Sequence, residues 1–207
     1  MVFISPPPPK ASINPVFNTC AAGTNIVRMF DPMRYAAQAA KFRYFGPCKR
    51  FDHHIEENRE PVLSTDRGII YAGKTLSGCI VEVFGDSRVI DVGTWEIASL
   101  QVKRDLELLD LRGSGAMTAG TVAAICKDSN HRYSQQWSQY FYDNHFLYRN
   151  VDGIVFENAH NNEVAYAFYE RCEADFSVNK VYALNSRSLR AQIQQIALKF
   201  GLIVSPY

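Results

Sequence analysis

The sequence lacks an excess of charge of either sign, since 22 basic and 21 acidic residues leave a formal net charge of +1. Proteins that bind nucleic acid through its phosphates usually carry a clustered excess of basic residues, so this balance argues against a DNA- or RNA-binding role. Long apolar runs are also missing, which argues against a membrane-spanning helix. No apolar core of a secretory signal precedes the proline run Pro6–Pro9. We therefore expect neither a nucleic-acid partner nor a membrane partner.

Paired cysteines are missing too. The five cysteines form an odd set without a C-x-x-C pair, which indicates free thiols in a reducing compartment such as the cytoplasm. A zinc site needs spaced Cys or His ligands, and the adjacent pair His53-His54 has no third ligand at a suitable spacing. We therefore expect no metal site.

Two common catalytic or binding motifs are also absent: the glycine-rich loop G-x-G-x-x-G and the G-x-S-x-G turn of serine hydrolases.

Core-forming residues, in contrast, are abundant. Apolar residues make up 47% and aromatic residues 13% of the 207 residues, enough for one well-filled domain. Residues 1–19, with their proline run, are predicted to form an extended arm, and residues 20–207 to form the folded domain. Strand-like and helix-like segments follow one another without a strict strand–helix–strand rhythm. This order predicts a single α+β domain with a mixed or antiparallel sheet and flanking helices.

The spacing of apolar residues and of capping residues locates the elements. Strands are predicted at residues 24–30, 67–71, 88–91, 97–102, 107–111, 152–156 and 180–184. Helices are predicted at residues 32–40, 75–84, 116–125, 132–142 and 189–200. The long segment 41–66 is irregular, and a loop of this length inside a compact domain is usually functional or mobile.

Two residues near the helix predicted at 75–84 are candidates for a site. Glu82 lies off the centre of the apolar stripe of that helix, so it is either a solvated glutamate or a carboxylate that faces a cleft. Tyr71 ends the preceding strand, and it is either a core aromatic or the wall of a pocket for a flat ring. The spacing alone leaves both alternatives open.

Two arginines and one polar segment are further candidates. Arg28 lies inside an apolar strand, where arginine is rarely buried without a partner, so it either pairs with an internal carboxylate or binds a phosphate. Arg50, in the long loop, is either a surface charge or a second phosphate contact. The segment 157–163 is densely polar directly after a strand, which indicates either the rim of a site or an Asn-rich turn.

The order of these residues along the chain resembles the RES domain family over roughly residues 24–170. The resemblance rests on IVRMFDP around Arg28, Arg50-Phe51 after Gly46-Pro47, GIIYAG around Tyr71, Glu82, LLDL at 108–111, SQQWSQYFYD at 134–143 and DGIVFENAHNNEVAYAFYER at 152–171. Each motif is weak by itself, and the ordered set is more specific.

The resemblance implies a fold like that of the ADP-ribosyltransferase toxins, with a split sheet and NAD⁺ held in a cleft. It also implies a toxin that degrades NAD⁺, with NAD⁺ as substrate and no separate cofactor. The implied partner is a proteinaceous antitoxin of the Xre type or an immunity protein. The implied place of action is the cytoplasm, either of the toxin's own cell or of a cell into which it is delivered.

The resemblance also implies roles for individual residues. Glu82, Arg28 and Tyr71 would be catalytic, with Glu82 stabilising positive charge on the ribose as a carboxylate does in glycoside cleavage. Arg28 and Arg50 would hold the pyrophosphate, and Tyr71 would stack on a ring of the substrate.

One position departs from the family pattern. Asn158 stands where the family has a serine, and an asparagine can still hydrogen-bond a ribose or a phosphate. We expect Asn158 to bind the substrate; the alternative is that Ser134 or Ser138 takes the part of the serine.

Three functions are compatible with this pattern. The first is an NAD⁺ glycohydrolase that cleaves the nicotinamide–ribose bond with water, or with phosphate in a phosphorolysis. The second is an ADP-ribosyltransferase that modifies a protein. The third is a non-catalytic binding module on the same fold, suggested by the missing serine.

Overall fold

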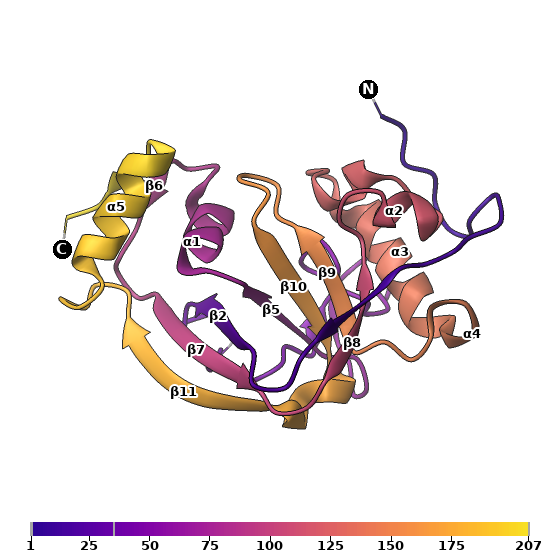
Figure 1. Cartoon of the computed structure of the whole chain (residues 1–207), viewed down its shortest axis with the longest axis horizontal. Coiled ribbons are helices and arrows are strands. Elements are labelled where there is room, and N and C mark those ends of the chain that lie inside the picture. The colour runs from indigo at the N-terminus through magenta and orange to yellow at the C-terminus, as the bar shows by residue number, and fades with distance from the viewer. Residues whose placement is uncertain (1, 35, 207) are drawn as a thin grey trace.

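The computed structural model describes residues 2–34 and 36–206, and it shows a strongly curled sheet with helices packed against it (Figure 1). The strands of this sheet are β1 (Phe17–Cys20), β2 (Asn25–Phe30), β5 (Ile69–Gly73), β7 (Glu96–Val102), β8 (Leu106–Asp110), β9 (Gly153–Glu157), β10 (Val164–Tyr169) and β11 (Phe176–Ala183). Their order across the sheet is β1-β8-β9-β10-β5-β2-β7-β11. Neighbouring strands are antiparallel, except that β8 and β9 are parallel.

The remaining elements are helices and short strand pairs. The helices are α1 (Leu76–Phe84), α2 (Gly115–Thr118), η1 (Ala123–Cys126), α3 (His131–Asp143), α4 (His145–Tyr148), η2 (Glu170–Asp175) and α5 (Arg190–Phe200). The short strands are β3 (Phe45–Gly46), which pairs with β4 (Val62–Leu63), and β6 (Val89–Ile90), which pairs with β12 (Ile203–Val204). Figure 1 shows α1 and α5 at one end of the curled sheet and α2, α3 and α4 at the other.

The sheet is split between β2 and β5. These two strands pair at one position, Val27 with Gly73, and then diverge. Beyond that position, the edge of β5 pairs with Arg43 instead of β2. The backbones of Arg43 and Ile69 form two hydrogen bonds there, of 2.9 and 3.0 Å. The predicted fold class, a single α+β domain with a mixed or antiparallel sheet and flanking helices, is confirmed.

Three apolar clusters hold the domain together. One lies between α3 and strands β8, β9, β10 and β5, and it includes the fully buried Trp137 and Phe141. A second joins α1 and α5 to β2 and β7 through residues such as Ile80 and Ile193. The third covers the opposite face of the sheet and includes Phe168. Burial of this apolar surface is the main force that stabilises the folded domain.

Two predicted helices are wrong. The segment 32–40 forms turns in its described residues, because Ala36 has a φ of 46°, in the left-handed region that ends a right-handed helix. The segment 116–125 is broken into α2 and η1 at Gly120, where φ is 94°. A Cβ at Gly120 would lie 2.5 Å from the Cβ of Pro9, so glycine is also required there for close packing.

The described part of the proline-rich arm predicted at residues 1–19, residues 2–19, is extended but docked on the domain. The side chain of Ile4 is buried, and the indole of Trp137 donates a hydrogen bond of 2.8 Å to the carbonyl of Ser5. The last residues of the predicted arm belong to β1, which is the edge strand beside β8. The predicted division at residue 20 therefore falls inside a strand of the sheet.

Candidate functional site

Helix α1 presents Glu82 at the surface. Its N-terminus is capped by Thr75, whose hydroxyl accepts a hydrogen bond of 2.9 Å from the backbone N–H of Gly78. Cys79, Ile80 and Phe84 are buried against the sheet, so the periodicity of the helix turns Glu82 away from the core.

The carboxylate of Glu82 is accessible to water yet surrounded by protein. Burial raises the pKa of Glu82, while the positive charges of His160 and Arg50 and a hydrogen bond from the backbone N–H of Ala159 lower it. The net direction is upward, because removal of water outweighs these favourable contacts. Glu82 is therefore a carboxylate with a defined neighbourhood rather than a freely solvated surface group.

Arg50 reaches the same place from the long loop. Its guanidinium donates a hydrogen bond to the backbone carbonyl of Asp128, at the start of the turn that leads into α3. Its charge acts on Glu82, Cys126 and His131, which belong to α1, η1 and α3. The structure thus brings together Glu82 and Arg50, which are 32 residues apart in the sequence.

The loop that carries Arg50 is held by a buried carboxylate that the sequence did not single out. Asp52 is fully buried, and its two oxygens accept hydrogen bonds of 2.8 and 2.7 Å from the guanidinium of Arg43. The backbone N–H groups of Cys48 and Lys49 donate to the same carboxylate at 2.5 and 2.9 Å. The hydroxyl of Tyr71 donates to it at 2.9 Å. One carboxylate therefore fixes the loop, a partly buried arginine and a strand residue.

Tyr71 uses its hydroxyl in this structural network. The hydroxyl accepts a hydrogen bond of 2.9 Å from the backbone N–H of Phe51 while it donates to Asp52. Burial, with the nearby charge of Asp52, holds the pKa of Tyr71 well above its ordinary value. The hydroxyl is therefore not available as an acid or base, and stacking of the partly buried ring on a substrate stays a prediction.

Arg28 lies apart from Glu82. Strand alternation puts Arg28 on the sheet face of Ile26 and Phe30, whereas α1 covers the face of Val27 and Met29. Its guanidinium is buried and lies over the ring of Phe30, 5.7 Å from the ring centroid. The structure therefore does not bring Arg28 into contact with Glu82.

The charge of Arg28 has little to balance it. Burial, together with the nearby positive charge of Arg43, lowers the pKa of Arg28 to about 10. Its guanidinium donates a hydrogen bond of 3.1 Å to the carbonyl of Lys41, and no carboxylate within residues 2–34 and 36–206 forms an ion pair with it. Such a buried, unneutralised guanidinium favours binding of an anion.

Asn158 is buried, with an exposed fraction of 1%. Its side-chain oxygen accepts hydrogen bonds of 3.2 and 2.9 Å from the backbone N–H groups of His160 and Asn161. Its side-chain nitrogen lies 3.4 Å from the carbonyl of Gly78 on α1. These contacts favour a role in shaping the β9–β10 loop beside Glu82, and direct contact of Asn158 with a substrate stays a prediction.

The sequence matches the RES domain family over residues 25–193. The chain belongs to the RES domain family. Among solved structures, a chain of the M. tuberculosis MbcT-MbcA toxin-antitoxin complex is similar, with a TM-score of 0.57 and 13% sequence identity. The likeness covers 87% of this chain and 92% of that chain, and at this identity it shows a shared fold. The comparison with curated proteins gave no match.

The histidine pair of this RES domain is part of its interior. His53 and His54 are fully buried, and their Nε2 atoms lie 3.0 Å from a carboxylate oxygen of Glu170 and 3.2 Å from the carbonyl of Arg43. Burial lowers the pKa of both rings, that of His54 to about 4. Within the described residues, no group of three His, Cys, Asp or Glu side chains could hold a metal ion.

Acidic conditions are expected to destabilise the RES domain through His54. In the native state its Nε2 donates a proton to a carbonyl and the ring stays neutral down to about pH 4, whereas in the unfolded chain it becomes protonated below about pH 6.5. Stability that is present above the unfolded-state pKa is therefore lost as the pH falls from 6.5 to 4, by at most about 3 kcal/mol. The free energy of unfolding, measured with urea at several pH values, should depend less steeply on pH in His54→Gln than in the unchanged chain. An equal dependence on pH in both would contradict the assignment.

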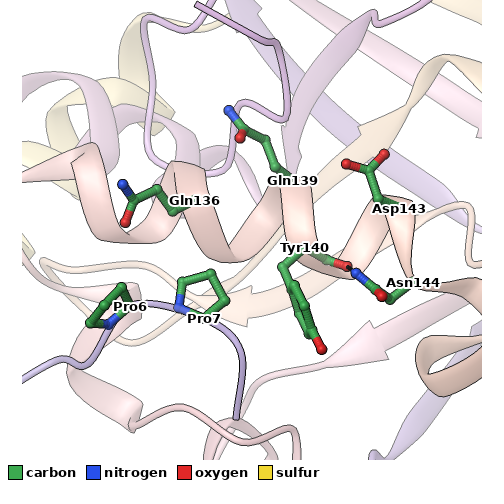
Figure 2. Close-up of a pocket in the computed structure, with 7 residues that line it drawn as sticks. All are labelled: Pro6, Pro7, Gln136, Gln139, Tyr140, Asp143 and Asn144. Carbon is green, nitrogen blue, oxygen red and sulfur yellow. Dashed lines mark hydrogen bonds between the residues drawn. The ribbon is translucent and has the colours of Figure 1, made fainter.

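A separate groove lies between the N-terminal arm and α3. Its volume is about 320 Å³, and Figure 2 shows the arm prolines facing the helix across it. It is lined by Pro6, Pro7, Gln136, Gln139, Tyr140, Asp143 and Asn144. None of these residues belongs to the Glu82 neighbourhood, so the groove is distinct from the candidate site.

None of the helices formed by the described residues combines the length and the apolar character that a membrane span requires.

Sequence reasoning missed four residues. Two of them, Asp52 and Arg43, hold the long loop. The other two are histidines: His160 is beside Glu82, and His131 is beside Arg50. His160 lies in the polar segment 157–163, for which the sequence left open either the rim of a site or an Asn-rich turn. Asp52 and Arg43 gave no signal, because their partnership depends on how the long loop folds back on β5.

Proposed function

We propose that this RES domain cleaves the bond between nicotinamide and ribose in NAD⁺. The observation that carries the proposal is Glu82, an accessible carboxylate held by the N–H of Ala159 and flanked by Arg50 and His160. Cleavage of this bond builds positive charge on the ribose, as in glycoside hydrolysis. A fixed carboxylate beside that carbon stabilises the transition state more than the bound substrate, which lowers the barrier.

The proposed reaction is a hydrolysis, and it needs no reactant besides NAD⁺ and water. Nicotinamide leaves as a neutral molecule with the electrons of the broken bond. Water attacks the ribose carbon, loses one proton and yields ADP-ribose. The carboxylate of Glu82 is suited to orient this water or a ribose hydroxyl, because it is a hydrogen-bond acceptor that remains open to solvent.

The two arginines divide the binding of the pyrophosphate in this proposal. Arg50 neighbours Glu82, and its contact is a backbone carbonyl rather than a carboxylate, so its charge is free for a phosphate. Arg28 is buried without a carboxylate partner, and it lies where β2 and β5 separate. Because Arg28 does not contact Glu82, we assign it to binding rather than to bond cleavage.

Arg28→Lys is expected to raise the KM for NAD⁺ by about tenfold and to leave kcat within about twofold. Lysine keeps the positive charge, but it loses the planar fork that can hold a phosphate through two hydrogen bonds. Initial rates over a range of NAD⁺ concentrations separate the two parameters. A fall in kcat with an unchanged KM would instead assign Arg28 to the chemical step.

The activity itself is tested by incubating the purified chain with NAD⁺ and following nicotinamide and ADP-ribose by chromatography. Release of both in equal amounts supports hydrolysis. A phosphorylated ADP-ribose that forms only in phosphate buffer indicates phosphorolysis, and label from NAD⁺ on added protein indicates ADP-ribosyl transfer. No nicotinamide release above that of Glu82→Gln would contradict the proposal.

We further propose that the chain is a toxin that depletes cytoplasmic NAD⁺ and is neutralised by a protein partner. Membership of the RES domain family and the fold shared with a chain of a toxin-antitoxin complex support this proposal. Controlled expression in a bacterial host is expected to lower cellular NAD⁺ and to stop growth, whereas Glu82→Gln should do neither. Growth arrest with unchanged NAD⁺ would contradict the proposed route of toxicity.

A further inference from the structure

The β9–β10 loop, residues 158–163, lies along α1 and holds it at both ends. At the N-terminal end of the helix, the hydroxyls of Thr75 and Ser77 donate hydrogen bonds to the carboxylate of Glu163, the second at 2.6 Å. In the first turn of the helix, the side chain of Asn158 contacts the carbonyl of Gly78. The loop therefore has a fixed position relative to the helix that carries Glu82.

At the C-terminal end of α1 the same loop places the ring of His160. The backbone N–H of His160 donates to the side-chain oxygen of Asn158 at 3.2 Å, which fixes the start of the turn. The imidazole covers Gly85 so closely that a Cβ there would lie 2.7 Å from the Cγ and Nδ1 atoms of the ring. The Nε2 atom lies 3.9 Å from the carboxylate of Asp86. His160 is thus held over the last turn of the helix, near Glu82.

We propose that His160 is a positioning residue that keeps Glu82 ionised under acidic conditions and so extends NAD⁺ cleavage to lower pH. The inference rests on the proposed function of Glu82. The protonated imidazole places a positive charge beside a carboxylate that burial otherwise pushes toward the neutral acid. The neighbouring N–H of Ala159 fixes the same carboxylate, so one loop sets both its position and its charge.

Other charged groups near Glu82 and His160 also affect the ionisation of Glu82. Arg50, from the long loop, also favours the ionised form of Glu82, and Asp86, on the same helix end, opposes it. A carboxylate oxygen of Asp86 lies 3.9 Å from Nε2 of His160. Glu82 also contributes to the raised pKa of the buried Cys79 thiol, after burial itself and the charge of Glu163. Removal of His160 leaves Arg50 as the cation beside Glu82.

The test compares the pH profiles of NAD⁺ cleavage for the unchanged chain, His160→Gln and the matched control His145→Gln, an exposed histidine on α4. The acid limb of His160→Gln is expected to move to higher pH, so that its activity falls by about tenfold at the acid end and little at pH 8. The profile of His145→Gln should coincide with that of the unchanged chain. A uniform loss in His160→Gln at every pH would overturn the proposal, because a merely structural role predicts that result.

A second measurement does not depend on turnover. Carbon-detected NMR titration of ¹³C-glutamate-labelled protein, with Glu82→Gln to assign the signal, reports the ionisation of Glu82 directly. The Glu82 resonance is expected to titrate at higher pH in His160→Gln than in the unchanged chain. Coincident titration curves would overturn the inference about His160. If the curves differ while no variant releases nicotinamide, the proposed NAD⁺ cleavage fails and the charge coupling stands.

Discussion

Glu82→Gln is expected to lower the kcat of NAD⁺ cleavage by about 10²–10³-fold and to leave the KM within about threefold. Glutamine keeps the size of the side chain and can still accept the hydrogen bond from Ala159. It lacks the negative charge that stabilises the ribose cation in the transition state, and this charge contributes little to binding of the ground-state substrate. The loss should therefore be confined to the chemical step, as single-turnover measurements of nicotinamide release can show.

The control for this variant is Glu56→Gln, which removes an exposed glutamate from the long loop. Its kcat should match that of the unchanged chain. Both variants should keep the thermal midpoint of unfolding, because both side chains are exposed and surface substitutions rarely change stability by more than about 0.5 kcal/mol. A Glu82→Gln variant with full activity would move the catalytic role to another carboxylate.

The position of Glu82 could be predicted from the sequence because the signals that fix it are local. Thr75 caps α1, apolar residues at helical spacing bury one face, and Gly85 follows the last turn. All of these lie within one short segment, so the helix period alone turns Glu82 away from the core, while the choice between solvent and a cleft depends on distant segments.

Two strands could not be predicted from local sequence patterns. Strand β10 (Val164–Tyr169) was not predicted, although it lies in the centre of the sheet between β9 and β5. Five of its six residues are buried, so it reads as a continuous apolar run without the alternation of a half-exposed strand. Strand β1 was not predicted either, because its pairing with β8 depends on residues about 90 positions away.

The arrangement of the candidate site could be predicted only in part, for the same reason. The types of residue at positions 28, 50, 71 and 82 indicated an anion-binding, carboxylate-bearing site. The face of the sheet from which Arg28 projects depends on the register of β2 against β7, where Arg28 pairs with Ala98, and this register joins residues about 70 positions apart. The hydrogen bonds of Asp52 join residues from 43 to 71, so they form only when the long loop closes on β5.

Asp52→Ala is expected to lower the free energy of unfolding by about 3–5 kcal/mol. The substitution leaves the guanidinium of Arg43 without its carboxylate, and it removes the acceptor for the hydroxyl of Tyr71 and for two backbone N–H groups of the loop. Groups that lose their partner in the interior carry the full penalty of leaving water. This loss is a large share of the about 5–15 kcal/mol that stabilises a typical domain.

Urea unfolding followed by tryptophan fluorescence measures this change, with Asp66→Ala as the control, an exposed aspartate of the same loop that should lose about 0.5 kcal/mol or less. Asp52→Asn separates the charge from the hydrogen bonds: its carbonyl oxygen still accepts from the loop, and its neutral amide no longer balances Arg43. Its loss should fall between those of the two alanine variants. Equal losses for Asp52→Ala and Asp66→Ala would show that Asp52 does not hold the loop that carries Arg50.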